Sequence, residues 1–123
     1  MDLGLFSLSI NVQDINKSAD FYQKIGFEVI GGNIEQKWLI VQNSGHTIGL
    51  FEGMIEKNTL TFNPGWNSNA QKIEGAPDIR AIQQDFIDKG ISVDKVLEPS
   101  SSGPASFVVV DPDGNPILLD QHI

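Results

Sequence analysis

The residues best suited to acid–base chemistry lie near the end of the sequence. Asp120 and His122 are separated by one residue on a predicted last strand, so their side chains point to the same side of it. Such groups can accept and return protons, and Asp120 is the best candidate base, with His122 as its neighbour. A surface carboxylate at the end of a strand is the plainer alternative for Asp120.

Several other kinds of chemistry lack the residues that they need. The chain has no cysteine, which excludes disulfides, thiolate metal sites and thiol nucleophiles. It has no glycine-rich phosphate loop, no defensible Ser-His-Asp order and no basic stripe. The formal net charge of −8 repels phosphate backbones and anionic lipids, so we expect neither a nucleic-acid nor a membrane partner. This charge would favour a cationic small molecule, or it could simply maintain solubility.

The bulk composition is that of an ordinary globular protein. With 123 residues, 40% hydrophobic and 20% charged, the chain fits one compact unit. No apolar run approaches the roughly 20 residues that span a bilayer. The first residues do not resemble a secretion signal, and the lack of cysteine suits a reducing compartment, so we expect a cytoplasmic protein.

The first half of the chain alternates between strand and helix patterns. Apolar and polar residues alternate from 5 to 12, which predicts a half-buried strand. Asp14 then stands at a helix N-cap, and apolar residues at helical spacing lead to Gly26, which ends the helix. The further strands expected here span 27–30, 38–42 and 47–51, with a turn at Gly31-Gly32.

The second half repeats this order. Residues 7–11 are echoed by 59–63, Asp14 and Gly26 by Asp78 and Gly90, 27–29 by 91–93, and 45–50 by 114–119. The repeat predicts an α+β fold made of two βαβββ modules, 1–55 and 56–123, within a single domain of residues 1–123. The long segment Pro64–Pro77 interrupts the second module as a lid or an irregular surface excursion.

Three stretches, residues 12–15, 20–29 and 111–117, resemble the vicinal oxygen chelate superfamily of glyoxalases, bleomycin-resistance proteins and extradiol dioxygenases. The resemblance covers essentially the whole chain. It implies two curved mixed sheets that form a cleft, with helices packed outside, and it implies a homodimer, as is common among members.

The resemblance also implies where a metal would be bound. The four ligand positions of metal-dependent members fall on Ser7, Gly49, Thr59 and Leu118, and none of these is a histidine or an acid. Since a divalent cation needs at least three such donors, we expect no metal and no cofactor. A rearranged metal site would have to draw on His46, Glu52, Asp120 and His122.

The same register predicts what lines the cleft. Residues at alternate positions share a face, so hydroxyl and amide side chains of both modules would point into it, while Trp38 and Trp66 could add aromatic walls. Trp38 could equally belong to the core. We therefore expect a metal-free protein of the bleomycin-resistance kind that binds a small organic molecule in this cleft. One alternative is a glyoxalase-like lyase or isomerase that uses a rearranged metal site or acid–base chemistry of Asp120. Another is a structural protein whose useful part is its dimer surface. The predicted ligand-binding set is Ser7, Ser9, Asn11, Trp38, Gly49, Phe51, Thr59, Thr61, Asn63, Trp66 and Leu118.

Overall fold

The computed structural model describes residues 1–123, and the chain forms two compact units. The first unit spans Ser7–Thr59, and the second combines Met1–Phe6 with Leu60–Ile123. The N-terminal residues therefore pack with the second half of the chain: the ring of Phe6 lies 5.2 Å from the ring of Phe62. Apart from these residues, the division lies close to the seam between the two predicted modules.

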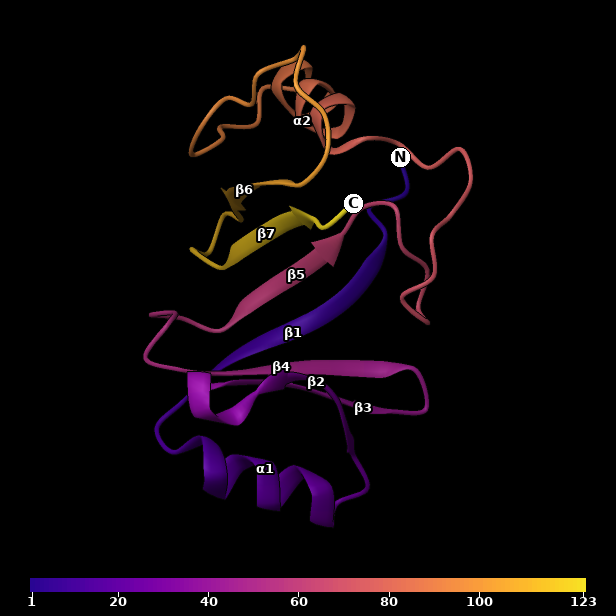
Figure 1. Ribbon diagram of the computed structural model, residues 1–123. Coiled ribbons are helices and arrows are strands. Elements are labelled where there is room, and N and C mark those ends of the chain that lie inside the picture. The colour runs from indigo at the N-terminus through magenta and orange to yellow at the C-terminus, as the bar shows by residue number, and fades with distance from the viewer. The chain divides into compact units, whose positions relative to one another are not determined.

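The first unit is a four-stranded mixed sheet with one helix (Figure 1). Its strand order is β2-β3-β4-β1, with β1 parallel to β4 and the other pairs antiparallel. Helix α1 packs on one face of β2, β3 and β4. The elements are β1 (Leu5–Val12), α1 (Ile15–Lys24), β2 (Glu28–Asn33), a 3₁₀ helix (Ile34–Gln36), β3 (Trp38–Asn43) and β4 (His46–Glu52).

Helix α1 begins and ends where its sequence signals predict. The Asp14 carboxylate accepts hydrogen bonds from the backbone N–H groups of Asn16 and Lys17, at 3.0 and 3.2 Å. After the helix, Gly26 adopts a φ of +111°, which a side chain would disfavour. The apolar side of the helix is buried against β3 and β4, and this core comprises Ile15, Ala19, Leu39, Val41 and Leu50.

Strand β2 differs from its prediction at two glycines. The sequence predicts a turn at Gly31-Gly32, but both residues pair with β3 inside the strand, after an irregularity between Val29 and Gly31. A Cβ atom on Gly32 would lie 2.7 Å from Leu39 Cα, so the glycine permits close approach of the two backbones. The turn prediction is therefore wrong, because both glycines pair with β3 and Gly32 leaves room for its backbone.

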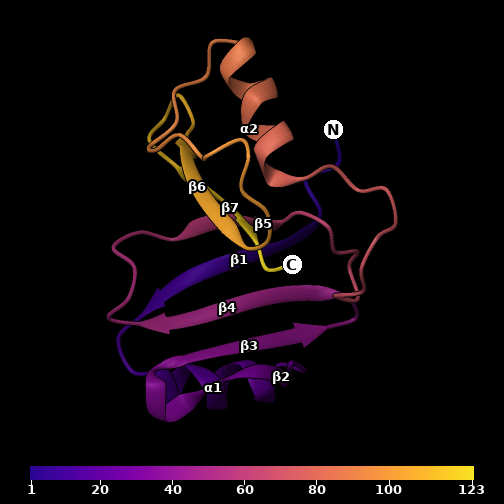
Figure 2. The same cartoon turned by 45° about the horizontal axis from the view of Figure 1, so that its top comes forward.

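The second unit has three strands and one helix. Its strands lie in the order β5-β7-β6, with β5 parallel and β6 antiparallel to β7. Figure 2 shows these strands with α2 on one side of them. The elements are β5 (Thr59–Asn63), α2 (Ile79–Asp88), β6 (Ala105–Val110) and β7 (Pro116–Gln121). The buried core consists of Ile79, Ile82, Phe107, Val109 and Leu119.

One predicted strand of the second module is not formed. The repeat predicts a strand around Ile91 and Val93, yet this segment carries no regular strand. Its link to β6 is made by Asp94, whose N–H donates to the Val108 carbonyl at 3.2 Å, and whose carboxylate accepts from the Val108 N–H at 2.8 Å. The Asp94 side chain thus accepts the hydrogen bond of the Val108 N–H, which a backbone carbonyl of a neighbouring strand would otherwise accept. No further strand pairing follows along β6. The second module is βαββ with an extended segment in place of one strand.

Both helices are anchored by the same device. The N–H of Ile15 donates to Glu52 at the end of β4, and the N–H of Ile79 donates to Gln121 at the end of β7, each over 2.9 Å. Asp78 caps α2 as Asp14 caps α1. In each module, the end of the last strand therefore contacts the first residue of the helix in the same way, as expected for a duplicated unit.

The predicted α+β fold class is confirmed, with one helix against a curved sheet in each module. Each helix has ten residues, and neither has the length and apolar character that would let it cross a bilayer.

Candidate functional site

In the first unit, the sheet surface opposite α1 carries a polar and aromatic set of side chains, which we call the first face. The strand register aligns Ser9 with Gly49 on β4, and Gly49 with Ile40 on β3. The next row aligns Asn11 with Phe51 and Trp38. Since the intervening residues Leu39, Val41 and Leu50 form the core, the first face points away from the helix. It comprises Ser7, Ser9, Asn11, Trp38, Gly49 and Phe51.

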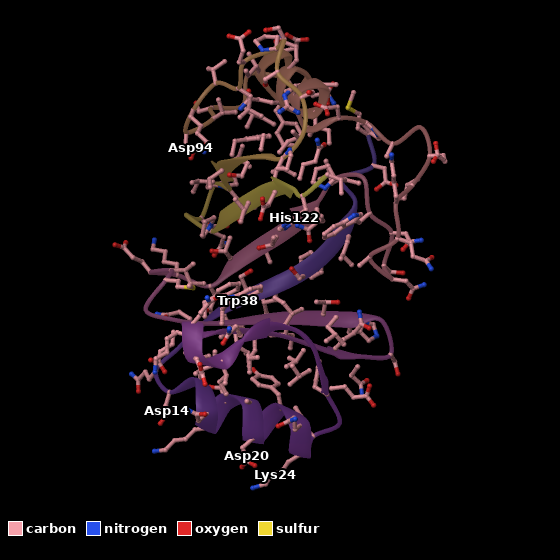
Figure 3. All side chains as sticks on the ribbon, viewed as in Figure 1. Asp14, Asp20, Lys24, Trp38, Asp94 and His122 are labelled. Carbon is pink, nitrogen blue, oxygen red and sulfur yellow. The ribbon has the colours of Figure 1, made fainter.

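The aromatic part of the first face is built around Gly49. A Cβ atom on this residue would lie 2.7 Å from Cε2 of Phe51, so the phenyl ring fills the space that a side chain at position 49 would need. The rings of Phe51 and Trp38 are nearly parallel, at 6° and 6.5 Å between centroids. Trp38, labelled in Figure 3, thus lies outside the core. Its ring and that of Phe51 form a flat apolar surface.

The polar part of the first face lies at its other end. Ser7 and Ser9 are buried, and Ser7 is aligned with Thr47 and Gln42. The Gln42 amide donates to the Thr47 hydroxyl over 3.0 Å. Sequence reasoning missed Thr47 and Gln42, although strict alternation from Gly49 and Trp38 would have placed both on this surface.

In the second unit, the corresponding second face comprises Thr61, Asn63, Trp66, Leu118, Asp120 and His122. Leu118 is aligned with Thr61 on β5 and with Val108 on β6. It is only half-buried and lies outside the core, whereas Leu119 is fully buried within it. The buried Asn63 donates to the backbone carbonyl of Asp120 over 2.8 Å. Thr59, at the start of β5, falls in the first unit, and its hydroxyl donates to the carbonyl of Lys57 over 3.0 Å.

Three candidate residues meet on the second face. Nε2 of His122 lies 3.2 Å from Oδ2 of Asp120, and the imidazole stacks on Trp66 with 4.9 Å between ring centroids and 4° between planes. The side chains of Asp120 and His122 remain 34% and 49% exposed, so both are accessible to a ligand. A carboxylate that orients an imidazole is an arrangement suited to proton transfer.

The segment Pro64–Pro77 positions Trp66 through internal hydrogen bonds. The N–H of Ile73 donates to the carbonyl of Gly65 over 2.7 Å, and Trp66 forms an isolated bridge with Lys72. Asn67 accepts further bonds from Asn69 and Gln71 at 2.9 and 3.1 Å. The segment is therefore a small hairpin that holds the indole against His122.

The residues present do not fit the metal site of metal-dependent members. Ser7, Gly49, Thr59 and Leu118 offer at most two hydroxyl oxygens, which are poor ligands for a divalent cation compared with imidazole and carboxylate. The alternative set is also dispersed: Glu52 caps α1 and pairs with Lys37 at 3.3 Å, and His46 is exposed beside a turn. No three histidine or acidic side chains lie close enough together to hold a metal ion.

Comparison with known proteins decides the family. The model of the Glyoxalase/Bleomycin resistance protein/Dioxygenase superfamily matches residues 4–119. The chain belongs to this superfamily. The resemblance drawn from its short motifs and internal repeat is thereby confirmed. No curated protein matches this superfamily member.

Solved structures share the fold at low sequence identity. A superfamily member from Vibrio splendidus 12B01 is 16% identical, with 94% of this chain and 97% of that chain covered and a TM-score of 0.63. An NAD-dependent benzaldehyde dehydrogenase from Legionella pneumophila is 19% identical, with 96% and 99% covered and a TM-score of 0.70. Homoprotocatechuate 2,3-dioxygenase from Arthrobacter globiformis is 17% identical, with 98% and 36% covered and a TM-score of 0.56. Names so different show that the fold alone does not select an activity.

Proposed function

We propose that this superfamily member binds a small organic molecule on its polar and aromatic first face without a metal. The observation that carries the proposal is the Phe51 ring, which fills the space above Gly49 and lies parallel to Trp38. In a metal-dependent relative this position would hold a ligand side chain; here it holds part of an aromatic surface. Such a surface suits the flat apolar part of an organic ligand.

The polar residues of the first face indicate which chemical groups the rest of the ligand carries. On the first face, the exposed Asn11 and the half-buried Gln42 offer amide groups. These groups can donate and accept hydrogen bonds without carrying charge. The net charge of −8 disfavours an anionic ligand. A neutral or cationic molecule with an aromatic ring and hydrogen-bonding substituents fits best.

The decisive experiment is a thermal-shift screen of small organic molecules in excess EDTA, followed by calorimetry on the molecules that raise the melting temperature. Phe51→Ala should weaken binding by at least about tenfold, as for an aromatic contact worth about 1.4 kcal/mol or more. Phe21→Ala is the matched control, because this phenylalanine is exposed on α1. Binding that needs an added divalent metal, or that Phe51→Ala leaves unchanged, would overturn the proposal.

An acid–base lyase or isomerase is the second candidate, favoured by the Asp120–His122 pair stacked on Trp66. In this function Asp120 removes a proton from a carbon acid, and His122, whose Nε2 lies 3.2 Å from Oδ2 of Asp120, holds the carboxylate in place. Molecules found in the screen can be incubated with the protein in D₂O and followed by NMR for deuterium uptake at carbon. Uptake that is lost in both His122→Gln and Asp120→Asn supports the enzyme; uptake that survives either change rejects it.

We further propose that the two units act together as one domain, that the protein is a homodimer, and that it works in the cytoplasm. The dimer is supported by apolar side chains that remain exposed around β2 and the end of α1, namely Ile25, Val29 and Ile30. The cytoplasm is suggested by a chain that needs no oxidising compartment, since it has no cysteine to pair.

A further inference from the structure

The second unit has a groove that the proposed function does not use. It opens beside β6, where the predicted strand around Ile91 is not formed, and its cavity volume is about 670 Å³. This volume lies within the range of pockets that hold small organic molecules. The lining residues come from three segments, Ile91–Asp94, Val108–Pro112 and Ile117.

The groove has an apolar floor because the sheet edge is left uncovered. Val109 is buried in the core and Ile117 packs against it, while Ile91 and Val110 remain 41% and 61% exposed. The segment before β6 touches that strand through the two hydrogen bonds between Asp94 and Val108. Removing Ile91 and Val110 from water would be favourable, since both present apolar surface to the solvent.

Two carboxylates line this apolar groove, and no lysine, arginine or histidine does. The Val108 N–H holds Oδ1 of Asp94 at 2.8 Å, which fixes one acid at the edge of β6 (Figure 3). Asp111 accepts from the N–H groups of Asp113 and Asn115, both at 2.9 Å, and from the Asn115 amide at 2.8 Å. The Asn115 side chain, aided by these backbone N–H groups, lowers the pKa of Asp111.

We propose that this groove is a second ligand site, which takes a small organic cation with an apolar body, such as an aryl-alkyl amine. The apolar part would cover Val110 and Ile91, and the ammonium group would lie near Asp94 and Asp111. Charge complementarity selects this occupant over an acid, because both carboxylates repel an anion and no lining residue would neutralise it.

Benzylamine and benzyl alcohol test the proposal, since they share a ring but only the amine is charged at neutral pH. In NMR titrations of the full chain, benzylamine should shift the backbone signals of residues 91–94 and 108–111. Asp94→Asn keeps an oxygen for the Val108 N–H but removes the charge, and should weaken benzylamine binding by about two- to fivefold, as for one exposed charge pair. Val110→Arg should abolish binding.

Two control variants distinguish binding in the groove from a general effect of charge and from binding on the first face. Asp113→Asn makes the same change of charge in the neighbouring turn, outside the groove lining, and should leave benzylamine binding unchanged. Phe51→Ala should also leave it unchanged. Equal binding of benzyl alcohol, or an equal loss in Asp113→Asn, would overturn the proposal. So would a dimer that Val110→Arg dissociates, because the occupant would then be a second copy of the chain.

Discussion

Gly49 lies on β4 where a methyl group would come within 2.7 Å of the Phe51 ring. Gly49→Ala should therefore push the ring away from Trp38 and cost about 1–3 kcal/mol of unfolding free energy, the usual range for overpacking. Gly31→Ala is a matched control on the same sheet surface, because its added carbon would meet Ile40 at an ordinary 3.7 Å. Urea unfolding of both variants checks this, and equal stabilities would contradict the observed packing.

The Asp78 carboxylate makes the stability of the protein depend on pH. Partial burial tends to raise the pKa of Asp78, but hydrogen bonds from the Arg80 N–H, the Gln121 amide and the Arg80 guanidinium outweigh it and lower the pKa. The carboxylate therefore stabilises the fold above its ordinary pKa of 3.8, and this contribution is lost as the pH falls through the lower folded value.

Asp78→Asn should thus destabilise the protein at pH 7 by no more than about 0.5 kcal/mol, since the side chain is about half exposed and solvent screens its ion pair with Arg80. Asparagine keeps the capping oxygen for the Arg80 N–H but loses the oxygen that accepts from the Gln121 amide, so the variant tests the charge together with that hydrogen bond. Unfolding free energies of both proteins should converge as the pH is lowered below 3.8. A difference that grows on acidification would show that the sign is wrong.

The register of β7 decides which of its side chains enter the core and which face away from it. Leu118 is half-buried beside Thr61, while Leu119 is fully buried in the core. Leu118→Glu should cost no more than about 1–1.5 kcal/mol, as for substitutions outside a packed core. Leu119→Glu would bury an unpaired charge, and should cost several kcal/mol or prevent folding. Denaturant unfolding that gives equal losses for the two variants would refute the register.

For the whole molecule, we expect a homodimer whose stability depends on salt. Each chain carries a net charge of −8, so two copies repel one another, and added salt should screen this repulsion and tighten the dimer. Light scattering over a range of protein concentrations, at low and moderate ionic strength, measures both effects. A mass that stays near 13.5 kDa at all concentrations and salt levels would rule out the dimer.

Local signals in the sequence were sufficient for the fold class, both helices and the faces of the strands. Asp14 and Asp78 mark the helix starts because a capping oxygen bonds to N–H groups only two or three residues away. Alternation separates Leu118 from Leu119 because neighbouring side chains on a strand point to opposite sides. These features depend on a few adjacent residues, so they can be read from the sequence without knowledge of any distant partner.

Contacts between distant residues decided the rest. Whether the glycines of β2 turn or pair depends on how closely β3 approaches, and whether a strand forms near Ile91 depends on the Asp94 carboxylate taking the Val108 N–H. The sequence pairs Asp120 with His122 on the last strand but marks Trp66 as a candidate separately. Only the hairpin of residues 64–77 brings the indole against the imidazole. These contacts depend on tertiary packing, because the residues that make them are far apart along the chain.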